Sequence, residues 1–201
     1  MRLEGFIKEF YPEWYGIQEY PADKTAAFCK VAEEWGILGN FAPTPIVVDG
    51  VPFDCTEKLF QVMKFADTES RNGLFSLKGQ RIKMRAKHYE KVGVVRPDWG
   101  RIFIDAMKFC LVQKYTQSEA FRRELERSRG LFIVEKQANP KRPAGAYSAK
   151  LSADGTTWIG PNIMGRLLME LRDKGTLSYT LPEDAMRFRD LNAPGPVTFS
   201  S

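Results

Sequence analysis

The stretch Thr56-Glu57-Lys58-Leu59-Phe60-Gln61-Val62-Met63-Lys64-Phe65 decides how this chain is interpreted. We predict a helix with Thr56 as its N-cap, because a threonine oxygen can accept a hydrogen bond from a free amide of the first turn. The helix is expected to run to about Asp67. In it, Glu57, Gln61 and Lys64 stand at i, i+4 and i+7, so a carboxylate, an amide and an amine share one face. We call these three residues the polar stripe.

Hydrophobic periodicity predicts the elements around this helix. The predicted helices cover residues 80–89, residues 99–114, a shorter segment capped by Ser118 and stopped by Gly130, and a last segment with Pro161 at its first position that ends near Gly175. The predicted strands cover residues 28–31, 46–48 and 131–135, and Asp49-Gly50 favours a hairpin after the second strand. Helices outnumber strands, so the expected fold is α+β, a single compact and mostly helical domain with a few short strands.

The 201 residues are expected to form one domain with two extensions. Residues 1–24 are rich in aromatic side chains and turn formers, which predicts an irregular arm packed on the domain. Residues 25–190 form the domain itself, which contains no repeat and no low-complexity linker. Residues 191–201 are expected to be a loose tail.

Composition argues against several classes of function. Cys29, Cys55 and Cys110 are widely separated and match neither a disulfide framework nor a zinc-ligand spacing. His88 is the only histidine, so a histidine metal site or a Ser-His-Asp triad would have to be built around it. We therefore expect no metal and no cofactor. We also expect an intracellular, cytoplasmic protein without membrane contact, because no apolar run is long enough to span a bilayer and the first residues begin no secretory signal.

The net charge of +5 leaves two interpretations open. Basic residues are dispersed through segments such as 78–91 and 122–129, with acidic residues between them in the second segment. This pattern fits an ordinary solvated surface, and it also fits a positive field that attracts phosphate groups.

The polar stripe likewise has more than one chemical interpretation. A glutamate and a lysine can divide acid and base work if burial shifts their pKa values toward neutrality. A neutral, desolvated lysine can also form a Schiff base with a carbonyl carbon. The third interpretation is a helix face that is merely solvated.

Five segments follow one another in an informative order. They are Asn40-Phe41; Glu57 with Phe60-Gln61 and Lys64-Phe65; Trp99 with Met107-Lys108-Phe109; the apolar run that ends in Glu135; and Gly160-Pro161-Asn162-Ile163-Met164-Gly165 with Leu168-Met169 and Arg172. In this order they resemble the NADAR family, also called YbiA-like. The resemblance covers about residues 28–173 and implies that residues 25–190 form a NADAR-like catalytic domain.

The resemblance implies N-glycosidase activity, namely removal of ADP-ribose from the exocyclic amine of guanine in DNA or RNA. That reaction reverses guanine ADP-ribosylation, so a guanine ADP-ribosyltransferase toxin encoded with the protein is an expected partner. One alternative is hydrolysis of riboflavin-pathway intermediates that carry a ribosylamino-pyrimidine. Both substrates join the sugar to an exocyclic nitrogen, and such a glycosylamine can open its ring to an imine. The other alternative is a non-catalytic module that binds ADP-ribose.

The resemblance also implies roles for individual residues. Glu57 is expected to shuttle protons, and Lys64 to act as a Schiff-base nucleophile or as an electrostatic partner of the departing base. Trp99 either stacks on the base or is structural, and Asn162 either receives a phosphate at a helix N-terminus or only caps the helix. The substrate-binding residues are expected to be Asn40, Phe41, Gln61, Trp99, Lys108, Glu135, Arg142, Tyr147 and Asn162.

The chain departs from the family pattern after Glu135. Family members carry an aspartate and then Trp-Gly in this region, whereas here no carboxylate follows Glu135 before Asp154. The departure leaves three explanations open: Arg142 or Tyr147 binds a phosphate or base instead, the substrate preference differs, or turnover is reduced. It also places most of the expected chemistry on Glu57 and Lys64.

Overall fold

The structure is a computed structural model that describes residues 3–191. The α-helices within these residues are α1 Leu3–Phe10, α2 Thr56–Met63, α3 Thr68–Phe75, α4 Gln80–Lys91, α5 Trp99–Gln117, α6 Glu119–Arg127 and α7 Ile163–Lys174. The strands are β1 Gln18–Pro21, β2 Thr25–Phe28, β3 Ile46–Val48, β4 Val51–Phe53, β5 Phe132–Glu135, β6 Lys150–Leu151 and β7 Thr157–Gly160. Short 3-10 segments cover Pro12–Trp14, Ala22–Lys24, Gly36–Leu38 and Glu183–Met186. The predicted α+β class with a helical majority is confirmed.

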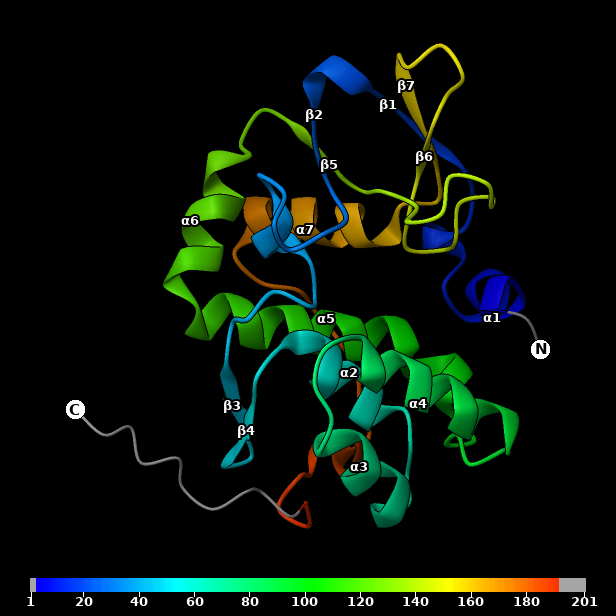
Figure 1. Cartoon of the computed structure of the whole chain (residues 1–201), viewed down its shortest axis with the longest axis vertical. Coiled ribbons are helices and arrows are strands. Elements are labelled where there is room, and N and C mark those ends of the chain that lie inside the picture. Colours follow the sequence, from blue (N-terminus) through cyan, green and yellow to red (C-terminus); the bar gives the residue numbers. More distant parts are fainter. Residues whose placement is uncertain (1–2, 192–201) are drawn as a thin grey trace.

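The long helix α5 forms the middle of the molecule. Figure 1 shows α7 and the strands β1, β2, β5, β6 and β7 on one side of α5, and α2, α3, α4 and the β3–β4 hairpin on the other. Helix α5 contacts both α2 and α7. Its buried side chains, among them Phe103, Ala106 and Cys110, therefore connect the two halves of one hydrophobic core.

The strands pair in three small sheets. Strands β1, β7 and β6 form an antiparallel sheet, β3 and β4 form an antiparallel hairpin, and β2 pairs in parallel with β5. The parallel register places Phe28 opposite Glu135 at the end of both strands. The predicted Asp49-Gly50 turn is confirmed, with φ of 51° at Asp49 and 77° at Gly50, the positive values that a tight two-residue hairpin turn requires.

The strand predicted at residues 28–31 lies three residues earlier, as β2. Ala26 and Phe28 point into the core, and the chain turns after Cys29. The Glu33 carboxylate accepts the backbone N–H of Cys29 at 2.9 Å, which stabilises that turn. Residues 29–31 are therefore outside the strand, although the composition of 28–31 is typical of a strand.

Helix α2 is shorter than predicted, and its N-cap is Cys55 rather than Thr56. The Thr56 hydroxyl donates to the backbone oxygen of Asn40 at 3.2 Å instead of capping the helix. The helix ends at Met63, and Asp67 begins a separate helix, α3, by accepting the Ser70 N–H at 2.7 Å. Apolar residues continue at helical spacing beyond Met63, so the sequence pattern did not indicate the break between the two helices.

The other predicted helices are present with small shifts at their ends. Ser118 caps α6 by accepting the Phe121 N–H at 3.2 Å, as predicted. The last helix begins two residues later than expected, because Asn162 is its N-cap and Pro161 lies outside the helix. Gly175 ends α7 with φ of 73°, in the left-handed region that favours glycine.

The expectation of an irregular N-terminal arm is wrong. This segment contains α1, which packs on α5, and β1, which pairs with β7. Ile7, Tyr11 and Trp14 are buried in the main core, so the segment belongs to the domain. At the other end, Leu191 is buried, and the rest of the expected loose tail lies outside the described residues.

Candidate active site

The candidate site begins where the Asn40-Phe41 turn meets the start of α2. The backbone oxygen of Asn40 accepts the Glu57 N–H at 2.9 Å, and its side-chain Nδ2 donates to Met107 Sδ at 3.2 Å. Asn40 is buried, and its Oδ1 lies 3.2 Å from the Thr56 hydroxyl. Asn40 therefore fixes the position of Glu57, since its polar atoms already have partners inside the protein.

Lys114 stabilises the turn that contains Asn40 and Phe41, and it was not identified from the sequence. Its fully buried ammonium donates to the backbone oxygens of Ile37 at 2.7 Å and Gly39 at 2.8 Å. Burial lowers the pKa of Lys114 to about 7. One signal was present in the sequence: Lys114 continues the buried stripe of α5 four residues after Cys110.

A Lys114→Met variant is expected to lose part of the pH dependence of stability. Between about pH 7 and pH 8.5 the unfolded chain keeps Lys114 protonated while the folded chain releases the proton, so the wild-type free energy of unfolding rises with pH. The rise amounts to about 1 kcal/mol per pH unit. Urea unfolding across this range should show it in the wild type and in the exposed control Lys174→Met, but not in Lys114→Met. Equal slopes in all three proteins would contradict the low pKa.

Two of the three residues of the polar stripe are buried, and Lys64 is partly buried. Every residue of α2 is buried, including Glu57 and Gln61, and Gln61 Nε2 donates to Glu57 Oε1 at 3.0 Å. Within residues 3–191, the buried Gln61 Oε1 has no hydrogen-bond partner. Lys64 follows α2 and forms a salt bridge with Glu90 at 2.5 Å. The interpretation of a merely solvated helix face is therefore wrong for Glu57 and Gln61.

Aromatic rings lie next to the stripe. Phe60 contacts Trp99 and Tyr147, with ring centroids 5.2 Å and 6.3 Å away, and the Lys64 ammonium lies 5.8 Å from the Trp99 ring. Burial raises the pKa of Tyr147 well above its ordinary value, so its phenol stays neutral. These rings come from α2, α5 and the loop before β6, which surround the stripe with apolar surface.

Glu135 joins this group from the end of β5. Burial raises the pKa of Glu135 to about 7; the Lys83 ammonium acts in the opposite direction, and the Glu57 carboxylate adds to the rise. Lys83 Nζ also lies 5.9 Å from the Phe41 ring. The structure thus brings Glu57, Glu135, Phe41 and Lys83 into one electrostatic environment. Lys83 was not identified from the sequence, because nothing in the basic segment 78–91 distinguishes it from its neighbours.

For three of the predicted substrate-binding residues, the structure shows other contacts or an exposed position. Lys108 forms a salt bridge with Asp105 at 3.0 Å and lies 5.8 Å from the Trp14 ring. Arg142 is exposed in the loop between β5 and β6. Asn162 is completely buried: its Nδ2 donates to the Ile133 oxygen at 2.8 Å and its Oδ1 accepts the Glu135 N–H at 3.2 Å.

Asn162 is the N-cap of α7, as one of the two expectations has it, although its side chain makes no cap hydrogen bond. The side chain is not open to a phosphate, because it is completely buried and its polar atoms are bonded to β5. It ties α7 to β5 and thereby supports Glu135. Asp154, the next carboxylate after Glu135, lies exposed in the turn between β6 and β7, where it accepts a hydrogen bond from Ser152 at 2.5 Å. It does not replace the family aspartate at the site.

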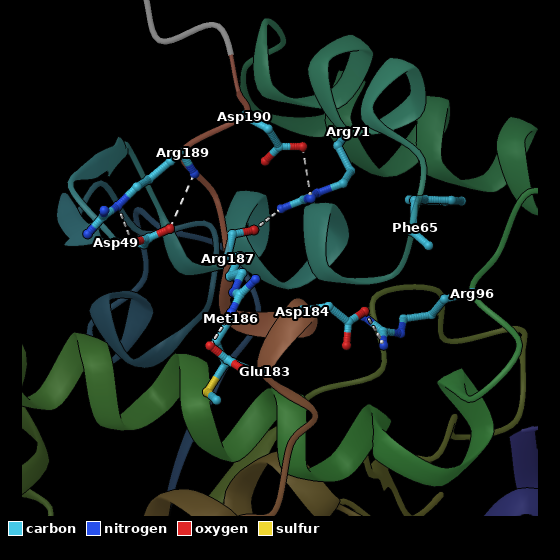
Figure 2. Close-up of a pocket in the computed structure, with 11 residues that line it drawn as sticks. Asp49, Phe65, Arg71, Arg96, Glu183, Asp184, Met186, Arg187, Arg189 and Asp190 are labelled. Carbon is cyan, nitrogen blue, oxygen red and sulfur yellow. Dashed lines mark hydrogen bonds and ion pairs between the residues drawn. The ribbon is translucent and has the colours of Figure 1, made fainter.

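A separate polar cavity of about 800 Å³ contains none of the predicted site residues. Figure 2 shows it between α3 and the segment 183–190, with Arg71 directed at Asp190 and Arg96 at Asp184. Arg71 also donates to the backbone oxygen of Arg187. Its lining carries four arginines and four acidic residues, so its charges are balanced; they are Arg71, Arg96, Arg187, Arg189, Asp49, Glu183, Asp184 and Asp190. These contacts fasten the C-terminal segment to the domain.

Three further findings concern the described residues. Across residues 3–191, no cluster of three or more His, Cys, Asp or Glu side chains is placed to hold a metal ion. In the same part of the chain, no helix has both the length and the apolar character needed to cross a membrane. Cys29, Cys55 and Cys110 are free cysteines.

Comparison with known proteins identifies the family. Residues 27–174, most of the chain, match the NADAR domain family. The chain belongs to the NADAR family. The matched span contains the polar stripe, Glu135 and Asn162, so the family extends over the whole candidate site.

Relatives of this NADAR protein point to a class of reaction. It is 28% identical to N-glycosidase YbiA of Escherichia coli (strain K12) over 158 residues, 79% of this chain and 92% of that protein. The NMR structure of E. coli YbiA resembles it with a TM-score of 0.59 and 26% identity, over 76% of this chain and 84% of YbiA. A riboflavin biosynthesis protein of Vibrio vulnificus (strain YJ016) is 23% identical over 181 residues, 90% of this chain and 46% of that protein. These relatives support N-glycosyl hydrolysis as the class of reaction.

Proposed function

We propose that this NADAR protein is an N-glycosidase that removes ADP-ribose from the exocyclic amine of guanine in DNA or RNA, through the domain of residues 25–190. The observation that carries the proposal is the pair Glu57 and Glu135. Glu57 is buried on α2 and acts electrostatically on Glu135, whose pKa burial raises to about 7. A carboxyl group with such a pKa can donate a proton at neutral pH, while a second carboxylate accepts one.

In the proposed reaction, Glu135 protonates the exocyclic nitrogen as the bond from the anomeric carbon to that nitrogen breaks. Glu57 accepts a proton from the water that forms the new carbon–oxygen bond. Guanine leaves with its amino group restored, and ADP-ribose leaves with a hydroxyl at the anomeric carbon. Glu57 then holds a proton taken from water and Glu135 has given one to the departing amine, so a proton transfer through solvent or between the carboxyl groups restores the starting state. Glu135 thus supplies the acid in this chain, which lacks the family aspartate.

Lys64 is proposed as an electrostatic partner of the reacting group. A Schiff-base nucleophile must be a neutral amine, whereas the Lys64 ammonium is ion-paired with Glu90 and lies over Trp99. The Trp99 ring, together with Phe60 and Tyr147, offers a surface for stacking of a base.

A second candidate function has its own support. The Vibrio vulnificus relative named for riboflavin biosynthesis is similar over 90% of this chain, which favours hydrolysis of a ribosylamino-pyrimidine phosphate as the alternative. The same two carboxyl groups would perform the same bond cleavage on that smaller substrate. The third candidate, a module that binds ADP-ribose without cleaving it, draws its support only from the absent aspartate.

The test is to incubate the protein separately with an ADP-ribosylated oligonucleotide and with the ribosylamino-pyrimidine phosphate, and to follow the released sugar by mass spectrometry. We expect ADP-ribose from the first substrate, carrying one ¹⁸O atom when the reaction is run in labelled water. Cleavage of the pyrimidine substrate alone would support the riboflavin alternative. Binding of ADP-ribose in a calorimeter without cleavage of either substrate would make the protein a binding module. Borohydride added during turnover should trap no adduct on Lys64.

A further inference from the structure

Helix α4 and the residue pair before it carry positive charge that, apart from Lys83, the candidate site does not use. Six exposed cations form what we call the α4 cationic face: Lys78, Arg81, Lys83, Arg85, Lys87 and Lys91. The single acidic residue of α4 is Glu90, which is already paired with Lys64. For the part of the chain that the structure describes, none of the six cations forms a salt bridge.

Two other basic parts of the protein, α6 and the lining of the polar cavity, are neutralised by their own neighbours. On α6, Arg127 pairs with Glu124 at 2.6 Å, and Arg129, just beyond the helix, pairs with Glu126 at 2.5 Å. The cavity in Figure 2 has equal numbers of arginines and acidic residues. Charge on α4 is instead arranged in like pairs at i and i+4, such as Lys83 with Lys87, which destabilise a helix by mutual repulsion. A bound anion would remove this repulsion.

The α4 cationic face is continuous with the candidate site. Lys83 lies over Phe41 and opposes the rise in the pKa of Glu135 that burial causes, while Glu90, seven residues further along α4, holds Lys64. Figure 1 shows α4 on the outside of the molecule, and it contacts α2, the helix of the polar stripe. A chain that leaves the site past Lys83 would therefore meet Lys87 and Lys91 next, because residues four apart share one side of a helix.

We propose that the α4 cationic face binds the phosphate backbone of the nucleic acid strand that flanks the modified guanine. This inference rests on the proposed function and assigns its substrate to polymers rather than free nucleotides. The twelve residues of α4 span about 18 Å. Consecutive phosphates of one DNA strand are ~3.4 Å apart along the axis of the double helix, so this length is enough for several of them. A mononucleotide held at Glu57 and Glu135 is too short to reach along that face.

The test uses the triple variant Arg81→Gln/Lys87→Gln/Lys91→Gln. None of these residues belongs to the candidate site, and glutamine keeps a high helix propensity. The control is Arg123→Gln/Arg129→Gln/Lys174→Gln, which removes the same charge from residues paired with Glu119, Glu126 and Glu170. Fluorescence anisotropy with an unmodified single-stranded DNA of about 20 nucleotides should show roughly tenfold weaker binding in the triple variant. The binding constant should also depend less on salt concentration in the triple variant. The slope of its logarithm against the logarithm of the salt concentration should be less steep by about 2, since each phosphate contact contributes about 0.7. The control should bind like the wild type.

A kinetic arm separates this proposal from the proposed function. The triple variant should lose about tenfold in kcat/KM on an ADP-ribosylated oligonucleotide and keep the wild-type value on ADP-ribosylated guanosine. If the wild type cleaves neither substrate, the proposed function fails, while anisotropy still decides whether the face binds nucleic acid. Equal DNA binding by the triple variant and the control would overturn the inference. Binding to phosphatidylserine vesicles but not to DNA would overturn it as well, in favour of a membrane surface.

Discussion

A Glu57→Gln variant is expected to lose about 100- to 10,000-fold in kcat while it folds like the wild type, because general acid–base catalysis contributes factors of this size. The glutamine oxygen can still accept the hydrogen bond that Gln61 Nε2 donates at 3.0 Å, so the buried pair stays satisfied. An amide cannot take a proton from the attacking water. The measurement is kcat for ADP-ribose release, with circular dichroism and thermal unfolding to verify the fold.

The matched control for this prediction is Lys58→Gln, the next residue of the same helix. Lys58 is as buried as Glu57, but its ammonium pairs with Asp54 at 3.0 Å. This control should lose stability and keep kcat near the wild-type value. A Glu135→Gln variant distinguishes the roles of the two carboxyl groups. In the wild type, kcat should fall above about pH 7 as Glu135 is deprotonated, whereas kcat of the variant should not show this fall. A Glu57→Gln enzyme with kcat within tenfold of the wild type would refute the assignment.

An Asn162→Ala variant is expected to lower the free energy of unfolding by about 3 to 5 kcal/mol, since it leaves two buried backbone groups unpaired at about 1–3 kcal/mol each. These groups are the Ile133 oxygen and the Glu135 N–H, bonded to Asn162 at 2.8 Å and 3.2 Å. Asn162 also has φ of 48°, a left-handed conformation that costs alanine about 1–2 kcal/mol. Urea unfolding of the variant and the wild type measures the loss.

The control for Asn162 is replacement by glycine, which removes the same side chain but adopts a positive φ without a steric penalty. Asn162→Gly should therefore be about 1 kcal/mol more stable than Asn162→Ala. The contact between α7 and β5 is close here, because a Cβ on Gly165 would lie 2.0 Å from the Ile133 oxygen. A side chain lost at position 162 is therefore lost from a tightly packed contact. Wild-type stability together with a large loss of substrate affinity would instead support a phosphate-binding role for Asn162.

Local signals in the sequence predicted much of the fold and placed Glu57 and Gln61 on one helix. The apolar repeat of α5, the Ser118 cap, the Asp49-Gly50 turn and the Gly175 end of α7 each depend on residues close in sequence. Errors arose where a distant segment decided the outcome. The Thr56 hydroxyl donates to the backbone oxygen of Asn40 and does not cap its own helix. The bounds of the strand that contains Phe28 are set by its pairing with β5.

The same division holds for the chemistry. By itself the sequence determined the family through the order of its segments, the spacing of Glu57, Gln61 and Lys64, and the concentration of basic residues on α4, because each of these is a property of residue order. Only the tertiary structure decided that Glu135 has a pKa near 7, that the buried Lys114 holds the Asn40-Phe41 turn, and that Asn162 is internal. The physical reason is desolvation: the free energy of a charge or a polar group depends on which distant segments exclude water from it, and no local pattern records those neighbours.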